Sequence, residues 1–170
     1  MNVSEAIRTK RAVRQFQDRA LPEEVVHAIL NAGRRAQSSK NNQPWQFIAI
    51  RQKDILSALS KTGTYASHLA GAALAVALLV PNPDERFQTL FDAGQAAAYM
   101  QLAAWELGVG SCPASIYEPE QARAILGFPE GWRVRICLSF GYPLDESQLS
   151  AAPKKGGRKA LDEMVHWEKW

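Results

Sequence analysis

A run of polar side chains between residues 38 and 43 offers the densest hydrogen-bonding chemistry in the chain. It lies in Ser38-Ser39-Lys40-Asn41-Asn42-Gln43-Pro44-Trp45. Asn and Gln amides supply both donors and acceptors, which suits a flat heterocycle whose edge alternates carbonyl groups with ring nitrogens, as in a flavin. Pro44 favours an extended backbone at Gln43 and so a fixed direction for its amide. The alternative is an ordinary loop, because Ser and Asn are common in turns for local backbone reasons.

Positive charge gathers at both ends of the sequence. The net charge is +3 and the pI is about 9.0, with Lys10, Arg11 and Arg14 near the start and Arg158 near the end. A phosphate group prefers charge-assisted, forked donors of this kind. Two short basic groups far apart in sequence fit one phosphate held from two sides. Nucleic acid is the less favoured partner, since the chain lacks a recognisable reading motif.

Length and composition indicate one domain spanning residues 1–170. With 170 residues and 46% apolar content, the chain can bury a sizeable core. Its longest apolar run, residues 69–80, is about half of the ~20 residues that a membrane-spanning helix needs, so no membrane contact is expected. The N-terminus lacks the pattern of a secretory signal, which favours the cytoplasm. Cys112 and Cys137 are therefore expected to stay reduced, and no ligand spacing suggests a metal.

Helical and strand patterns alternate along the chain. Helices are predicted at 4–10 with Ser4 as its cap, at 22–35, 54–59, 85–107 and 119–126. Strands are predicted at 45–51, 72–80 and 133–140, and a strand or loop at 108–117. The 72–80 strand is apolar at every position, which is typical of the centre of a sheet.

Two segments are too apolar to face water alone. The long helix is apolar nearly all round between residues 96 and 105, which predicts a place inside the fold or in an oligomer interface. After residue 144 the sequence becomes polar and then ends in a tail with Trp167 and Trp170. Those tryptophans bury their area only by docking on the chain's own body or on a second subunit.

The order of five motifs resembles the FMN-dependent nitroreductase-like family over nearly the whole chain. They are Lys10-Arg11-Ala12-Val13-Arg14-Gln15-Phe16, the Gln37–Trp45 loop, Asp92-Ala93-Gly94 continuing to Glu106-Leu107-Gly108-Val109-Gly110, Gly141-Tyr142-Pro143, and Arg158-Lys159-Ala160-Leu161 through Val165-His166-Trp167. Lys10, Ala12, Gln37 and Ala160 depart from the residues usual at these positions.

The resemblance implies an α+β fold, a three-layer α/β/α sandwich with a central mixed sheet. It also implies an intertwined homodimer with two FMN molecules at the subunit interface, and we expect the tail at 150–170 to dock on the partner. The implied enzyme passes hydride from NADH or NADPH through flavin N5 to a small electron-poor acceptor, such as a nitroaromatic or quinone. Other flavin chemistry on the same fold, dehalogenation or flavin destruction, and a non-catalytic basic nucleic-acid or regulatory binding module remain alternatives.

Family positions assign roles to individual residues. Lys10 and Arg158 become the phosphate pair with Arg11 nearby, while Arg14 serves the phosphate or the polar end of the ring. The ring edge or ribityl chain would meet Ser38, Ser39, Asn41 and Gln43. Backbone after the glycine turn, at Pro113, Ala114 and Ser115, would approach the flavin edge. No side chain is required as a catalytic group, because the chemistry belongs to the flavin. His68 is either structural or at the pocket border, and Cys112 is expected to be structural.

Overall fold

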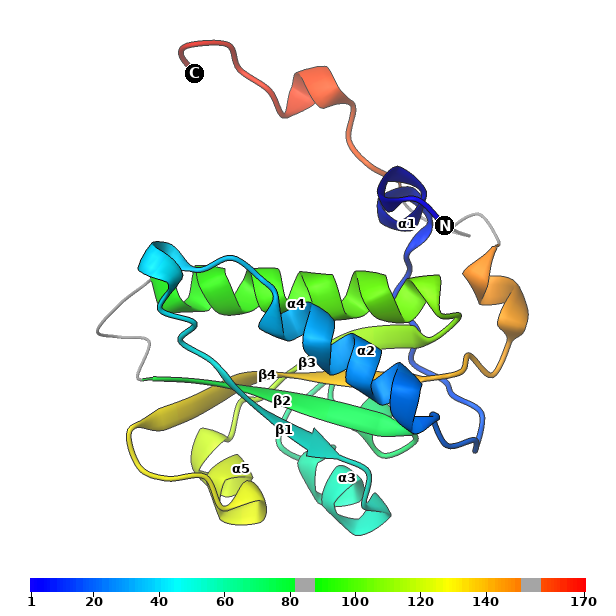
Figure 1. Ribbon diagram of the computed structural model, residues 1–170, viewed down its shortest axis with the longest axis vertical. Helices are drawn as coiled ribbons and strands as arrows, with labels where there is room; N and C mark the ends of the chain where they lie inside the picture. Colours follow the sequence, from blue (N-terminus) through cyan, green and yellow to red (C-terminus); the bar gives the residue numbers. More distant parts are fainter. Residues whose placement is uncertain (82–87, 151–156) are drawn as a thin grey trace.

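Four strands form one sheet in the computed structural model, which describes residues 1–81, 88–150 and 157–170. The strands are β1 (Gln46–Ile50), β2 (Leu74–Pro81), β3 (Gly110–Ser115) and β4 (Trp132–Gly141), in the order β1-β2-β4-β3 (Figure 1). Each neighbouring pair is antiparallel. The prediction of a mixed sheet is therefore wrong for the described strands. Parallel pairing is reduced there to one bridge between Ala12 and Ser111, because the N-terminal segment meets β3 only at its beginning.

Helices cover both faces of this sheet, as expected for an α+β fold. Figure 1 shows α2 (Glu23–Arg34) and α4 (Gln88–Glu106) on one face, with α3 (Lys53–Leu59) and α5 (Pro119–Leu126) on the other. The short α1 (Val3–Thr9) lies beside α4. Its cap is Asn2, whose Oδ1 accepts the Glu5 N–H at 2.9 Å. The prediction of Ser4 as the cap is wrong, because the helix starts one residue earlier than Ser4.

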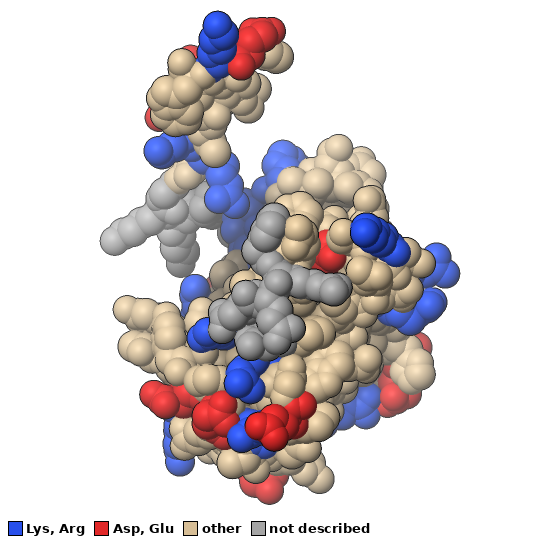
Figure 2. Space-filling view, turned by 90° about the vertical axis from the view of Figure 1, so that its left-hand side faces the viewer, with Lys and Arg blue, Asp and Glu red and all other residues tan. Residues whose placement is uncertain are grey.

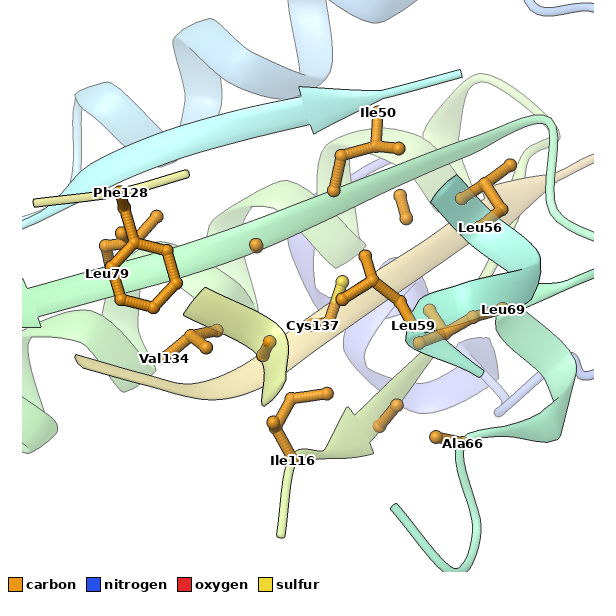
Figure 3. Packing of buried hydrophobic residues seen from close by; sticks show 14 residues of the cluster. Ile50, Leu56, Leu59, Ala66, Leu69, Leu79, Ile116, Phe128, Val134 and Cys137 are labelled. Carbon is orange, nitrogen blue, oxygen red and sulfur yellow. The ribbon is translucent and has the colours of Figure 1, made fainter. Parts of the chain in front are cut away.

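The side chains of β2 point alternately to the two faces of the sheet, so the interior consists of two hydrophobic cores. Leu74, Val76 and Leu78 pack with α2 and α4, in a cluster that includes Met100 and Phe140. The intervening residues of β2 face the other side and pack with α3 and α5, in the cluster drawn in Figure 3. Both faces of β2 are buried, which confirms its predicted central position.

Helix α4 buries one side and exposes the other. Ala96, Met100 and Ala104 are buried against the sheet and α2, whereas Phe91 and Tyr99 are exposed, Phe91 to 71%. The prediction was a place inside the fold or in an oligomer interface: the fold covers one side of the helix, and the interface stays a prediction for the exposed side. Its predicted start near residue 85 lies outside the described residues. No helix in the described ranges is both long and apolar enough to cross a membrane.

The C-terminal tail is exposed to solvent in the single chain. Residues 157–170, here called the tail segment, are all exposed and run away from the body of the molecule (Figure 1). Within it, the His166 and Trp170 rings are in tilted contact with their centroids 4.1 Å apart, and Trp167 is 80% exposed. The rest of the predicted docking tail, residues 151–156, lies outside the described residues. The chain's own body does not cover these tryptophans.

The N-terminal segment is tied to β3 by backbone contact. The Val13 N–H donates to the Ser111 carbonyl at 3.0 Å, and the Val13 side chain is fully buried. A Cβ on Gly110 would stand 2.6–2.8 Å from the atoms of that valine side chain. Glycine is therefore required at position 110 for the two segments to approach so closely.

Gly110→Ala should push the 10–14 segment away from β3. We expect a loss of about 1–3 kcal/mol in the free energy of unfolding, because the new methyl group overpacks a buried contact. Gly71→Ala is the matched control, since a Cβ at Gly71 would meet nothing within 4 Å. Urea denaturation followed by circular dichroism measures both variants. Equal stability of the two would contradict the close packing of Val13 on Gly110.

Candidate functional site

Two cations of the N-terminal segment surround the first buried residues of β3. Burial raises the pKa of the Cys112 thiol, and the nearby charges of Arg14 and Lys10 partly offset that rise, so both side chains lie close to this thiol. Burial in turn lowers the pKa of Lys10, whose ammonium group donates to Oε1 of Gln101 on α4. We call Lys10 and Arg14, gathered around Cys112, the cation cluster.

The cation cluster has no acidic partner, unlike several other cations of the chain. Arg51 pairs with Glu23, Lys53 with Asp18, and Arg123 with Glu120. Among the described residues, neither Lys10 nor Arg14 forms an ion pair. Lys10 is partly buried beside the neutral Gln101 and Arg14 is exposed, so both charges are left open to an external anion. The cluster is therefore suited to hold an anion.

Arg11 is used differently from its neighbours. Its Nη1 donates to the carbonyls of Arg8, Thr9 and Lys10 at 2.7–3.0 Å, which caps the C-terminal end of α1. These bonds occupy one end of the guanidinium group. The predicted phosphate role of Arg11 stays a prediction, and the structure gives it a capping role.

His68 lies behind the same part of β3 and joins it to β4. The ring is 6% exposed, and its Nδ1 lies 2.8 Å from Oγ of Ser139, which donates to the Cys112 carbonyl at 3.1 Å. Burial and the charge of Arg14 lower the pKa of His68, while the Pro113 carbonyl offsets part of this effect. A buried neutral imidazole thus supports the backbone at Cys112 and Pro113 from the side of η2 (Ser67–Leu69).

Unpaired buried polar atoms occur beside this junction. Among the described residues, the buried side-chain atoms without a hydrogen-bond partner are Arg11 Nε, His68 Nε2 and Ser111 Oγ. Buried polar groups are nearly always paired in folded proteins, so such a set requires an explanation. All three come from the N-terminal segment, the start of β3 or the histidine behind it. These atoms are therefore available for hydrogen bonds to a bound molecule.

Residues 38–43, the polar loop, lie farther along α4. The Ser39 N–H donates to Oδ2 of the buried Asp92 at 3.0 Å, and the Gln43 N–H donates to Oγ of Ser38 at 2.9 Å. Asn41 and Gln43 have exposed side chains. The polar loop contacts α4 at Asp92, and Lys10 contacts the same helix at Gln101. At a rise of about 1.5 Å per residue, these two positions are roughly 13 Å apart along the helix axis.

The backbone of the polar loop is strained. Lys40, Asn41 and Gln43 have φ values of 52°, 55° and 47°, in the left-handed region that glycine normally occupies. Such conformations cost about 1–3 kcal/mol each and are typical of functional sites. The prediction of an extended Gln43 before Pro44 is wrong. Bonds from the Gln43 N–H to Ser38 and from the Trp45 N–H to the Gln43 carbonyl, at 2.8 Å, override the preference that proline imposes.

The remaining predicted site residues are divided between β3 and the tail segment. Pro113 and Ser115 are exposed on β3, which is an edge strand, and Ala114 between them is buried. Arg158 is exposed in the tail segment and makes no hydrogen bond or ion pair within the described part of the chain. Figure 2 shows lysine and arginine side chains gathered where the tail segment meets the rest of the molecule. One protomer thus brings Lys10, Arg14 and β3 together, and leaves the polar loop and Arg158 apart from them.

Two side chains that matter here were not predicted to have a role. Gln101, the partner of Lys10, is the only polar side chain between residues 96 and 105 apart from the Tyr99 hydroxyl and the Trp105 indole N–H. Asp92 was noted only as part of a motif. An isolated polar residue in an apolar helical stretch is a signal that could have marked Gln101, whereas Asp92 lies between the polar Thr89 and Gln95 and has no such signal. Among the described residues, no group of three or more His, Cys, Asp or Glu side chains gathers as in a metal site.

Comparison with known proteins identifies the family of this chain. The sequence pattern of the nitroreductase family matches residues 7–65 and 57–142. The chain belongs to the nitroreductase family. This membership confirms the resemblance carried by the five motifs and the expectation of an oxidoreductase enzyme.

Individual relatives match this nitroreductase over nearly its full length. A protein of Archaeoglobus fulgidus, with the name "Putative NADH dehydrogenase/NAD(P)H nitroreductase", is 31% identical over 171 residues, which cover 96% of each chain. A Thermus thermophilus protein named NADH dehydrogenase is 26% identical, covering 93% of this chain and 92% of its own. The structure of an FMN-dependent nitroreductase from Clostridium difficile superposes with a TM-score of 0.85 at 27% identity, covering 99% of this chain and 100% of that one.

His68 should make the stability of this nitroreductase depend on pH. Its pKa in the folded state lies below the ordinary value of 6.5, so the unfolded chain binds the proton more tightly. The free energy of unfolding should fall as the pH drops below about 6.5, by at most about 1.4 kcal/mol per pH unit for one proton. His68→Gln should flatten this slope between pH 5 and 7. Urea denaturation at several pH values measures it, and an unchanged slope in the variant would assign the effect to other groups.

Proposed function

We propose that this nitroreductase is an FMN-dependent oxidoreductase that uses NADH or NADPH to reduce an electron-poor acceptor such as a nitroaromatic or a quinone. The observation that carries the proposal is the cation cluster without an acidic partner, next to three buried polar atoms that lack hydrogen-bond partners. The Clostridium difficile protein, matched over its whole length, has FMN dependence in its name.

The residues present fit the two ends of FMN. A phosphate with a charge near −2 suits Lys10 and Arg14, because charge-assisted hydrogen bonds to phosphate are the strong ones. Arg158 would bring a third cation to the phosphate if the tail segment docks nearby. The amides of Asn41 and Gln43 can donate to and accept from the ring edge. When bound, FMN supplies the two-electron chemistry, and the protein supplies binding, orientation and charge.

The side chains of this site then act through position and charge. Arg14 presents a positive charge next to His68, and this charge would anchor the phosphate end of the cofactor. Exposed Pro113 and Ser115 leave the edge of β3 open to a flat ligand. No nucleophile or general acid is required, so specificity for the acceptor rests on shape and stacking.

We propose that the enzyme works as a homodimer, with residues 1–170 as one FMN-binding domain per protomer. Exposed apolar side chains on α1, α4 and the tail segment support this, and they include Ile7, Phe91 and Trp167. A groove of about 460 Å³ between α1 and α4 is lined mostly by apolar groups, among them Val3 and Leu102. Apolar surface of this extent on a small protein is typical of an interface.

Lys10→Ala should weaken binding of FMN much more than binding of riboflavin, which lacks the phosphate. Loss of one charge-assisted bond predicts about 10- to 100-fold weaker FMN binding. Fluorescence quenching of the free flavins by the apoprotein measures both constants. Arg158→Ala should act in the same direction, whereas Lys61→Ala, at an exposed lysine outside the cation cluster, is the control. An equal loss for riboflavin would place Lys10 away from the phosphate.

Purified wild-type protein should carry the absorbance band of oxidised flavin, and NADH or NADPH should bleach it. A colourless protein that FMN cannot reconstitute would overturn the proposed function. Steady-state assays with nitroaromatic and quinone acceptors against both nicotinamides would identify the preferred pair.

The double substitution Trp167→Ala/Trp170→Ala should weaken the dimer. Buried aromatic side chains are frequent hot spots of interfaces, so we expect the dimer dissociation constant to rise at least about tenfold. Sedimentation equilibrium measures the constant, and Tyr65→Ala, an exposed aromatic outside the tail segment, is the matched control. A dimer of unchanged affinity would mean that the tail segment does not form the interface.

A further inference from the structure

Asp92 is a buried acid that contacts the polar loop instead of a cation. Its side chain is 4% exposed, and Oδ2 accepts the backbone N–H of Ser39 at 3.0 Å. Among the described residues, no lysine, arginine or histidine pairs with it. A buried carboxylate is costly unless it is hydrogen-bonded, so among the described contacts its bond to the loop is the one that compensates for its burial.

The hydrogen bond to Asp92 holds the polar loop at Ser39, the residue directly before the three with strained backbone. Lys40, Asn41 and Gln43 all have positive φ, and such backbone persists only where its surroundings over-determine it. Within the loop, the Asn41 N–H donates to the Ser38 carbonyl at 3.0 Å and the Gln43 N–H to the Ser38 hydroxyl. These bonds close the loop on itself but do not attach it to the body. Asp92 attaches it to α4, and the other such contact, from Gln95 Nε2 to the Gln37 carbonyl, is longer at 3.4 Å.

We propose that Asp92 is a positioning residue for flavin recognition, which fixes the polar loop so that the exposed amides of Asn41 and Gln43 meet the ring edge. The inference rests on the proposed function. Asp92 itself touches no ligand, and its effect passes through the Ser39 amide to the loop. Because the loop recognises the ring and the cation cluster recognises the phosphate, Asp92 affects the ring part of the affinity alone.

The test compares Asp92→Ala with wild type in binding FMN and riboflavin to the apoprotein. We expect both affinities to fall by the same factor, about tenfold, since one charge-assisted bond that preorganises the loop is lost. The ratio of FMN to riboflavin affinity should stay at its wild-type value, in contrast to Lys10→Ala. Asp92→Asn, which keeps an oxygen acceptor for the Ser39 N–H, should recover most of the loss. Thr89→Ala, at another buried polar position of the same helix, should change neither affinity.

Hydrogen exchange in the apoprotein gives a second readout that needs no flavin. Asp92→Ala and Asp92→Asn should speed exchange at the Ser39 and Gln43 amides, the first more than the second, without faster exchange in the middle of α4. Exchange faster throughout α4, or flavin affinities unchanged in Asp92→Ala while wild type binds FMN, would overturn the inference. Wild type that binds neither flavin would instead overturn the proposed function.

Discussion

The backbone bond between the Val13 N–H and the Ser111 carbonyl fixes where positive charge lies in this protein. It holds the N-terminal segment against the edge of the sheet, and further bonds from Gln17 to Tyr142 and from Leu144 to Gln15 extend the contact. Because Val13 is buried against Gly110, the residues on either side of it are restricted in direction. Lys10 and Arg14 consequently reach the region of Cys112 from a short segment that has no regular structure of its own.

The price of this arrangement is the partly buried positive charge of Lys10. Desolvation lowers the pKa of Lys10, and burial together with the charge of Arg14 lowers the pKa of His68, so the fold keeps the neighbouring imidazole neutral. Salt bridges on the surface of α2 and α5 show that the chain places acids beside cations elsewhere. Their absence from the described surroundings of Lys10 and Arg14 leaves both charges available to an external anion.

Periodicity predicted much of the fold and little of the site's geometry. The apolar run of β2 and the helical spacing in α2 and α5 give their elements within a few residues, because burial on one or both faces determines them. The antiparallel order of the sheet depends on long-range pairing that no local pattern records. The left-handed Gln43 and the capping role of Arg11 follow from hydrogen bonds to Ser38 and to the end of α1. Their residue types predicted that Gln43 and Arg11 form hydrogen bonds. They predicted neither the backbone conformation of Gln43 nor the hydrogen-bond partners of either residue.

Two features of the single protomer lack a partner among its described residues, and the proposed dimer would supply both partners. The tryptophans of the tail segment are exposed without an apolar neighbour from the body, and Arg158 in the same segment has no described partner. If the tryptophans dock on a second chain, Arg158 moves with them, because only a few residues separate it from Trp167. Flavin affinity and dimer affinity would then be linked, since each binding event orders the segment that the other requires. The distance between the polar loop and the cation cluster along α4 points the same way, because a second copy can supply one set of contacts for the ligand that the first copy holds by the other.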